Sequence, residues 1–225
     1  MYANESKGEK FPPLKYADGD DCSAYGVDFI FQGDVMYPEY LNDIKVLVCP
    51  SNPSGATKVA DGRWNRGGNP NNPVAPCQID SLDYLYGGWA LTSDLLMMPG
   101  QDHNDMRFNV PPEDLSPVGV LVDATVVATL TFMSDNVGDV PDGAVNRGQA
   151  AALVDNDVTI TNWPTIYRLR EGIERFFITD INNPAASTKA QSTLPLFWDA
   201  VSNEVREFSH VPGGSNVLYL DGHVS

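Results

Sequence analysis

The sequence has no long apolar stretch and few basic residues. No segment approaches the about 18–20 consecutive apolar residues of a membrane-spanning helix, and polar residues follow Met1 where a signal peptide would be apolar. Lys and Arg number 14 against 30 Asp and Glu, which gives a formal net charge of −16. Nucleic acids and anionic membrane surfaces bind basic patches, so this charge excludes both as expected partners. An acidic surface suits an extracellular protein or one that attracts Ca²⁺.

Cysteine and histidine are also scarce. The three cysteines, Cys22, Cys49 and Cys77, form no Cys-x-x-Cys pair, which argues against zinc-binding and thioredoxin-like chemistry. They allow one disulfide; we expect Cys49–Cys77, across the loop that these residues bracket, while the spacing leaves the other pairings open. The sequence contains no phosphate-binding loop, dinucleotide-binding, His-Glu-x-x-His or Gly-x-Ser-x-Gly pattern. We therefore expect a protein that is not an enzyme.

What is present is enough for one folded domain. The chain has 225 residues, of which 42% are hydrophobic and 10% aromatic, and a chain of this length buries roughly 70% of its unfolded surface. Its 19 glycines and 17 prolines, together with Asn- and Asp-rich stretches, predict many loops and short strands. We expect a single domain over residues 1–225.

Hydrophobic patterns and turn formers predict short elements between these loops. Residues 54–76 are almost all turn formers and predict a long surface excursion. Asp34 is the expected N-cap of a short helix. Asp221-Gly222 predicts a two-residue hairpin turn with both residues at positive φ. We expect helices over 1–8, 34–41 and 183–190, and strands over 44–49, 83–91 (as a central strand), 165–170, 175–178 and 194–198. Residues 118–132 fit a buried helix or a pair of strands, and their length favours the helix.

Three acidic residues stand at the ends of expected strands. Asp180, Asp199 and Asp221 could meet at one edge of a sheet, and amide oxygens of Asn182 or Asn183 lie close in sequence. Hard oxygen ligands of this kind bind Ca²⁺. The simpler interpretation is that these residues end strands and begin turns, as Asp often does.

Aromatic residues gather in one expected strand. Tyr84 and Tyr86 fall on one strand face, and Trp89 falls on the other. We expect these side chains to pack in the core rather than to form a ligand platform.

The C-terminal sequence resembles a known family. It carries the pattern His210-Val-Pro-Gly-Gly-Ser-Asn-Val-Leu-Tyr-Leu-Asp-Gly-His-Val224, similar to the His, nine residues, Asp-Gly motif of pilin-like proteins found in planctomycetes and lentisphaerae. These proteins are related to the pseudopilins of type II secretion systems. Ten residues, rather than nine, separate His210 from Asp221 here. Further similar segments are Tyr37-Pro-Glu-Tyr-Leu41, Val46-Leu-Val-Cys-Pro-Ser51, Tyr84-Leu-Tyr-Gly-Gly-Trp89 and Arg170-Glu-Gly-Ile-Glu-Arg-Phe-Phe-Ile-Thr-Asp180.

The resemblance implies a fold and a function. It implies an α+β pilin-like head in which residues 1–10 end an N-terminal helix packed on an antiparallel sheet, residues 50–160 form a loop-rich insertion, and residues 163–225 form the C-terminal sheet. It implies a structural subunit of an extracellular or periplasmic filament, whose partners are further copies and other pilin-like subunits. An apolar helix preceding Met1 would anchor the subunit in the inner membrane before assembly. Ca²⁺ binding by related pseudopilins strengthens the expectation of a Ca²⁺ site, although their ligand pattern is not recognisable here.

Two alternatives stay open. The first is a secreted module in which loops 54–76 and 99–112 bind a glycan or a peptide, recognisable by an aromatic groove that includes Trp64 or Trp89. The second is a hydrolase that uses His210 with a nearby carboxylate.

Overall fold

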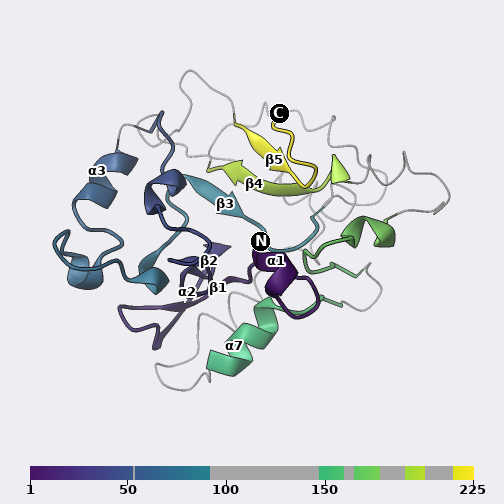
Figure 1. Ribbon diagram of the computed structural model, residues 1–225, viewed down its shortest axis with the longest axis horizontal. Helices are drawn as coiled ribbons and strands as arrows, with labels where there is room; N and C mark the ends of the chain where they lie inside the picture. The colour runs from purple at the N-terminus through teal and green to yellow at the C-terminus, as the bar shows by residue number, and fades with distance from the viewer. Residues whose placement is uncertain (53, 92–146, 160–164, 178–190, 201–214) are drawn as a thin grey trace, which may run out of the picture.

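The molecule combines short helices with small antiparallel sheets (Figure 1). The computed structural model describes residues 1–52, 54–91, 147–159, 165–177, 191–200 and 215–225. The expected mixed α+β class is confirmed. In chain order the elements are α1 (Tyr2–Glu5), β1 (Leu14–Asp18), β2 (Ala24–Phe31), α2 (Gly33–Met36), η1 (Ile44–Leu47), α3 (Gly55–Ala60), η2 (Arg66–Gly68), η3 (Pro76–Gln78), β3 (Tyr84–Tyr86), α7 (Arg147–Val154), η5 (Ile173–Phe176), β4 (Pro195–Asp199) and β5 (Val217–Tyr219), where η denotes a 3₁₀-helix.

The strands form two separate sheets. β1 pairs with β2, and its first four residues are all buried, which explains their mainly apolar sequence. The second sheet has the order β3-β4-β5, with Leu85 opposite Trp198 and Trp198 opposite Val217. Within the described residues β4 is therefore the central strand. The expectation that residues 83–91 form a central strand is wrong, because β3 ends at Tyr86 and lies at the edge of this sheet.

Residues 165–170 form isolated β-bridges rather than the strand expected there. Ile166 bridges to Val158, Arg168 to Trp89 and Arg170 to Lys10, so alternate residues pair with three different segments. Arg168 is fully buried and donates hydrogen bonds to the carbonyl oxygens of Gly88, Phe11 and Pro12. This guanidinium thereby satisfies backbone groups that no regular sheet reaches.

Two expected strands are 3₁₀-helices instead. Residues 44–47 form η1 because the carboxylate of Asp43 accepts a hydrogen bond from the Lys45 amide at 3.0 Å, which turns the chain at its start. Val46 is 60% exposed, so the alternation that suggested a strand does not mark a buried face. Residues 173–176 form η5 after Gly172, whose φ of 68° reverses the chain before the segment expected as a strand.

Some of the expected helices are present and others differ in length or position. A helix over the first residues is confirmed as α1, and Gly8 follows it with φ 81°. α2 is shorter than expected and Asp34 lies inside it, because the helix begins at Gly33 with Gln32 as N-cap. The excursion over 54–76 contains α3 and η2, which its turn formers did not predict. The helices expected over 118–132 and 183–190 lie outside the described residues.

The C-terminal hairpin is confirmed, with a different turn. β5 returns through Leu220, Asp221 and Gly222, and the amide of Gly222 donates to the Tyr219 carbonyl at 2.9 Å. Only Gly222 has positive φ, at 88°. The loop therefore has three residues ending in a left-handed glycine, rather than the expected two-residue turn with two left-handed positions.

Candidate functional site

Three segments that carry the family resemblance surround one apolar hollow. These are residues 46–51, β3 and the C-terminal hairpin, which Figure 1 shows beside β4. The hollow has a volume of about 570 Å³, and its walls include Leu47, Tyr84, Trp198 and Val224. We call it the sheet hollow. Segments far apart in the sequence thus form one surface over the second sheet.

A buried carboxylate fixes one wall of the sheet hollow. Asp83 is 1% exposed, and its Oδ2 accepts a hydrogen bond from the Cys49 amide at 2.8 Å while Oδ1 accepts one from the Asn52 side chain. The Asn52 Oδ1 in turn accepts from the amides of Ser54 and Gly55. A Cβ at position 55 would lie 2.6 Å from Asp83 Oδ2, which explains the glycine.

Tyr84, which lines the sheet hollow, has a pKa that is clearly shifted from its ordinary value. Burial, and to a lesser degree the Cys49 thiol beside it, raise the pKa of Tyr84 to about 12. The phenol is therefore protonated at neutral pH, so it donates hydrogen bonds and does not act as a base.

The structure does not bring Asp199 and Asp221 together. Asp199 ends β4, is 3% exposed, and its Oδ2 accepts from the Asn216 amide at 2.7 Å and from its side chain at 3.0 Å. Asp221 lies exposed in the turn beyond the opposite end of β5, where its Oδ1 accepts from the His223 amide at 3.1 Å. Asp180, Asn182, Asn183 and the candidate hydrolase residue His210 lie outside the described residues. Calcium binding therefore stays a prediction, and the described carboxylates act as local hydrogen-bond acceptors.

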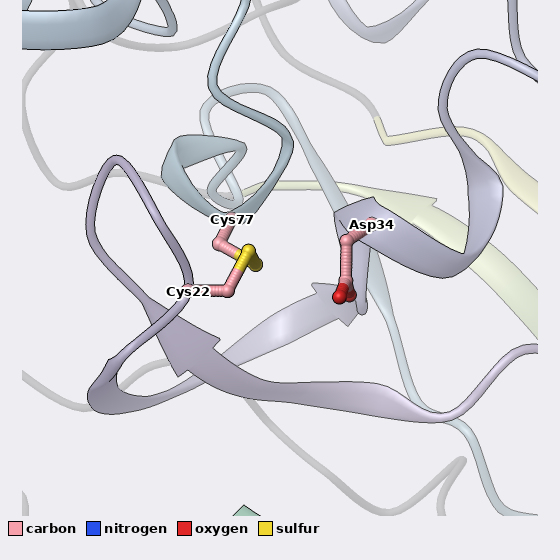
Figure 2. Close-up of side chains that lie close together, drawn as sticks. All are labelled: Cys22, Asp34 and Cys77. Carbon is pink, nitrogen blue, oxygen red and sulfur yellow. A yellow bond between two sulfur atoms is a disulfide. The ribbon is translucent and has the colours of Figure 1, made fainter.

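The expected disulfide Cys49–Cys77 is wrong. Cys77 pairs with Cys22 instead, with a Cα–Cα distance of 5.3 Å (Figure 2). Cys49 is buried and takes no part in a disulfide. The turn between β1 and β2 carries Cys22 to η3, whereas the Asp83 carboxylate holds the Cys49 backbone at the wall of the sheet hollow. Three cysteines allow three pairings, and nothing local in the sequence distinguishes them.

Tyr86 and Trp89 are core residues, as expected, whereas Tyr84 is partly buried and lines the sheet hollow. Tyr86 is 1% exposed and its hydroxyl donates to the Pro12 carbonyl at 2.7 Å. Trp64 and Trp89 are 0% and 5% exposed, and their indole N–H groups donate to Asp80 Oδ1 and to the Asn156 carbonyl. Neither tryptophan can line an open groove, which removes the feature by which the glycan- or peptide-binding alternative was to be recognised.

The sequence did not predict the roles of three polar residues, Gln32, Asp34 and Asp83. Gln32 and Asp83 are almost fully buried, and Asp34 lies within 4.8 Å of the Cys22 and Cys77 sulfur atoms. The only local signal for Gln32 is its place directly after the apolar residues that end β2. Asp83 gives a similar signal, since it precedes the aromatic β3.

Comparison with protein-family models, with curated proteins and with solved structures found no match for this chain. Among the residues that the structure describes, no helix has the length and apolar character needed to cross a membrane.

Proposed function

We propose that this chain is a structural subunit of an extracellular or periplasmic pilus-like filament, related to the pseudopilins of type II secretion systems. In this proposal it assembles with further copies and with other pilin-like subunits, and it is anchored in the inner membrane before assembly. It has no catalytic role. Its acidic, loop-rich head faces solvent in the filament.

The observation that carries the proposal is that α1 and the second sheet line one shared space. A space of about 380 Å³ between them is lined by Tyr2 and Ala3 of α1 and by Leu196 and Phe197 of β4. Figure 1 shows α1 at the centre of the molecule, close to this sheet. The pilin resemblance implies a helix packed on an antiparallel sheet, and the position of α1 across this space from β4 supports that arrangement.

Residues 37–41, one of the segments that resemble the pilin-like proteins, contact α1. The ring of Tyr40, in the segment 37–41, contacts the ring of Tyr2 edge to face with centroids 5.2 Å apart. The Tyr40 hydroxyl also donates a hydrogen bond to Glu5. The Cys22–Cys77 disulfide supports an oxidising compartment, since such bonds persist mainly outside the cytosol.

The test is the assembly state of the protein in the cells that make it. We expect the newly made protein in the inner-membrane fraction, and the sheared surface fraction to contain sedimenting filaments that electron microscopy resolves and antibodies to this chain label. Tyr40→Ala should lower filament yield up to about tenfold, because an aromatic pair contributes about 0.5–1.5 kcal/mol.

Tyr219→Ala is the matched control, because it removes a tyrosine ring from the far hairpin, where Tyr219 stacks on His223. It should leave filament yield unchanged while the folded head is retained. A native protein that sediments only as a monomer, under all conditions in which it is made, would overturn the proposal.

A further inference from the structure

Two cysteines and one carboxylate from three distant segments meet beside α2. The Sγ atoms of Cys22 and Cys77 and a carboxylate oxygen of Asp34 all lie within 4.8 Å of one another, and Figure 2 shows the three side chains gathered between their backbones. Cys22 comes from the β1–β2 turn, Asp34 from α2 and Cys77 from η3. We call these three residues the Cys–Asp cluster.

Close backbone packing places Asp34 beside Cys77. A Cβ at position 33 would lie 1.9 Å from the carbonyl oxygen of Pro76, so only glycine lets α2 approach η3 this closely. Asp34 and Cys77 each directly follow one of these two contacting residues in the chain. The glycine thus sets the spacing of the cluster.

The buried side-chain amide of Gln32 holds two members of the cluster in position through hydrogen bonds. Gln32 is 0% exposed, and its Oε1 accepts hydrogen bonds from the amides of Tyr16 at 2.9 Å and Ala17 at 3.0 Å. Its Nε2 is thereby fixed, and it donates to Asp34 Oδ1 at 2.6 Å and to Cys77 Sγ at 3.0 Å. Hydrogen bonds from a second layer of residues to metal-binding groups are what hold ligands in position at metal sites.

We propose that reduction of the Cys22–Cys77 disulfide converts the Cys–Asp cluster into a site for a thiophilic divalent ion of the Zn(II) class. Two thiolates and one carboxylate supply three ligands, and water completes a tetrahedron. Zinc at roughly 2.3 Å from sulfur and 2.1 Å from oxygen separates its ligand atoms by roughly 3.5–3.8 Å. The two sulfur atoms, bonded to each other in the disulfide, must therefore move apart after reduction, and the carboxylate oxygen lies within 4.8 Å of both. Calcium does not fit, because it takes oxygen ligands.

The chemistry balances with a dithiol as reductant. The dithiol gives two electrons and two protons to the S–S bond and becomes a disulfide itself, leaving two thiols on this chain. The metal ion then displaces both thiol protons as it binds. In the oxidised chain the two sulfur atoms are bonded to each other and do not bind the ion.

The consequence is that one cross-link has two chemical forms. The disulfide joins residues 55 apart in sequence, and a metal ion held by the same two sulfur atoms closes the same loop when the bond is reduced. The site therefore keeps β1, β2 and η3 together in a reducing environment. This inference is independent of the proposed filament function.

The experiment is a metal titration of the full chain, reduced with a phosphine that becomes its oxide. Co(II) should bind with one equivalent per chain and give sulfur-to-cobalt charge-transfer absorption, which Zn(II) abolishes by displacement. Asp34→Asn should weaken binding by about tenfold or more, the scale seen when metal sites lose one supporting group. Asp21→Asn removes a neighbouring exposed carboxylate and should have no effect, and Cys49→Ala should keep full binding.

Stability measurements keep the test decisive if the reduced chain unfolds without metal. Zn(II) at 100 times its dissociation constant should then raise the ratio of folded to unfolded chain about 100-fold. Failure of Zn(II) to bind or refold the reduced chain overturns the proposal. Binding that survives Cys22→Ser or Asp34→Asn unchanged overturns it as well, because the ligands are then elsewhere.

Discussion

The N-terminal region and the C-terminal sheet bury their backbones by different means. In the N-terminal region, the described part of residues 10–91, buried polar side chains bind backbone groups. Lys15 Nζ donates to the Ile79 carbonyl at 3.0 Å, and Gln32 accepts from two amides of β1. In the C-terminal sheet, residues 194–200 with 215–225, backbone pairing does most of this work, as in the bond from the Leu220 amide to the Leu194 carbonyl at 2.9 Å.

Burial differs accordingly. All of β5 is only partly buried, and Leu194 and Asp199 are the buried residues of the described C-terminal sheet. The N-terminal region is rich in loops, whose backbone groups cannot pair as strands do and must find side-chain partners when buried. A few buried polar side chains and one disulfide thus allow the loops of the N-terminal region to be buried in the core. We therefore expect the two regions to respond differently to the loss of single side chains.

Removal of the cross-link should have the largest effect. The double substitution Cys22→Ala, Cys77→Ala releases a loop with a sequence separation of 55, for which loop-closure entropy predicts a loss of about 4 kcal/mol in the free energy of unfolding. Urea unfolding measures the total. Hydrogen exchange should show lost protection in β1 and β2 before β4 and β5.

The control for this prediction is Cys49→Ala, which removes a buried thiol and keeps the disulfide. We expect it to cost about 1 kcal/mol, the scale of a small deletion in a core. If the double variant lost protection equally in both sheets, the two regions would form one cooperative unit, and the comparison would fail.

Arg168→Met should have the next largest effect, because Arg168 binds the backbone near both ends of the N-terminal region. Its guanidinium binds the carbonyls of Phe11 and Pro12 ahead of β1 and that of Gly88 after β3. Three hydrogen bonds from the buried guanidinium are lost, at about 1 kcal/mol each, so the free energy of unfolding should fall by up to about 3 kcal/mol. The Pro12 and Gly88 carbonyls keep the Tyr86 hydroxyl and the Leu169 amide as donors. The urea midpoint measures this loss, and exchange protection should fall in both β1 and β3.

Arg170→Met is the matched control. Arg170 lies two residues away, is partly exposed, and forms an ion pair with Asp157. An ion pair of this exposure contributes less than about 1 kcal/mol. Equal losses for the two arginine variants would show that the buried hydrogen bonds of Arg168 do not stabilise the N-terminal region more than a partly exposed ion pair does.

The sequence predicted the C-terminal sheet better than the N-terminal region, because the elements of this sheet depend on local patterns. The strand at 194–198 and the hairpin at Asp221-Gly222 depend on local patterns: alternating apolar residues and a glycine that can adopt positive φ. Even there, the two-residue turn was wrong, because whether one or two positions are left-handed depends on the pairing beyond the turn.

The N-terminal region depends on contacts between distant residues. The apolar run 44–49 has the composition of a strand, yet Asp83 binds the Cys49 amide from 34 residues away and η1 forms before it. The disulfide partner of Cys77 is likewise chosen by the approach of the β1–β2 turn to η3. Local propensity does not contain such information. The Cys–Asp cluster was missed for the same reason, since its members are spread over 56 positions of the chain.

The smallest predicted effect is a local acid transition of the C-terminal hairpin. The amide and then the ring of His223 donate hydrogen bonds to the Asp221 carboxylate and hold its pKa below the ordinary value of 3.8. An acid with a lowered pKa in the folded state stabilises that state fully above pH 3.8, and this contribution is lost as pH falls from 3.8 through the folded value.

Asp199 and Asp221 both bind backbone amides of the C-terminal sheet, and Asp221 is the exposed one of the two. Its titration therefore tests how far the hairpin depends on a polar side chain. Following the His223 amide by NMR, we expect its shift to titrate below pH 3.8 and the pairing of Val217 with Ser225 to loosen over the same range. Asp221→Asn should abolish this transition. Asp43→Asn removes a similar exposed turn carboxylate at η1 and should leave the hairpin profile unchanged. A transition that persists in Asp221→Asn would assign it to another group, and the hairpin would then be held by its backbone pairing alone.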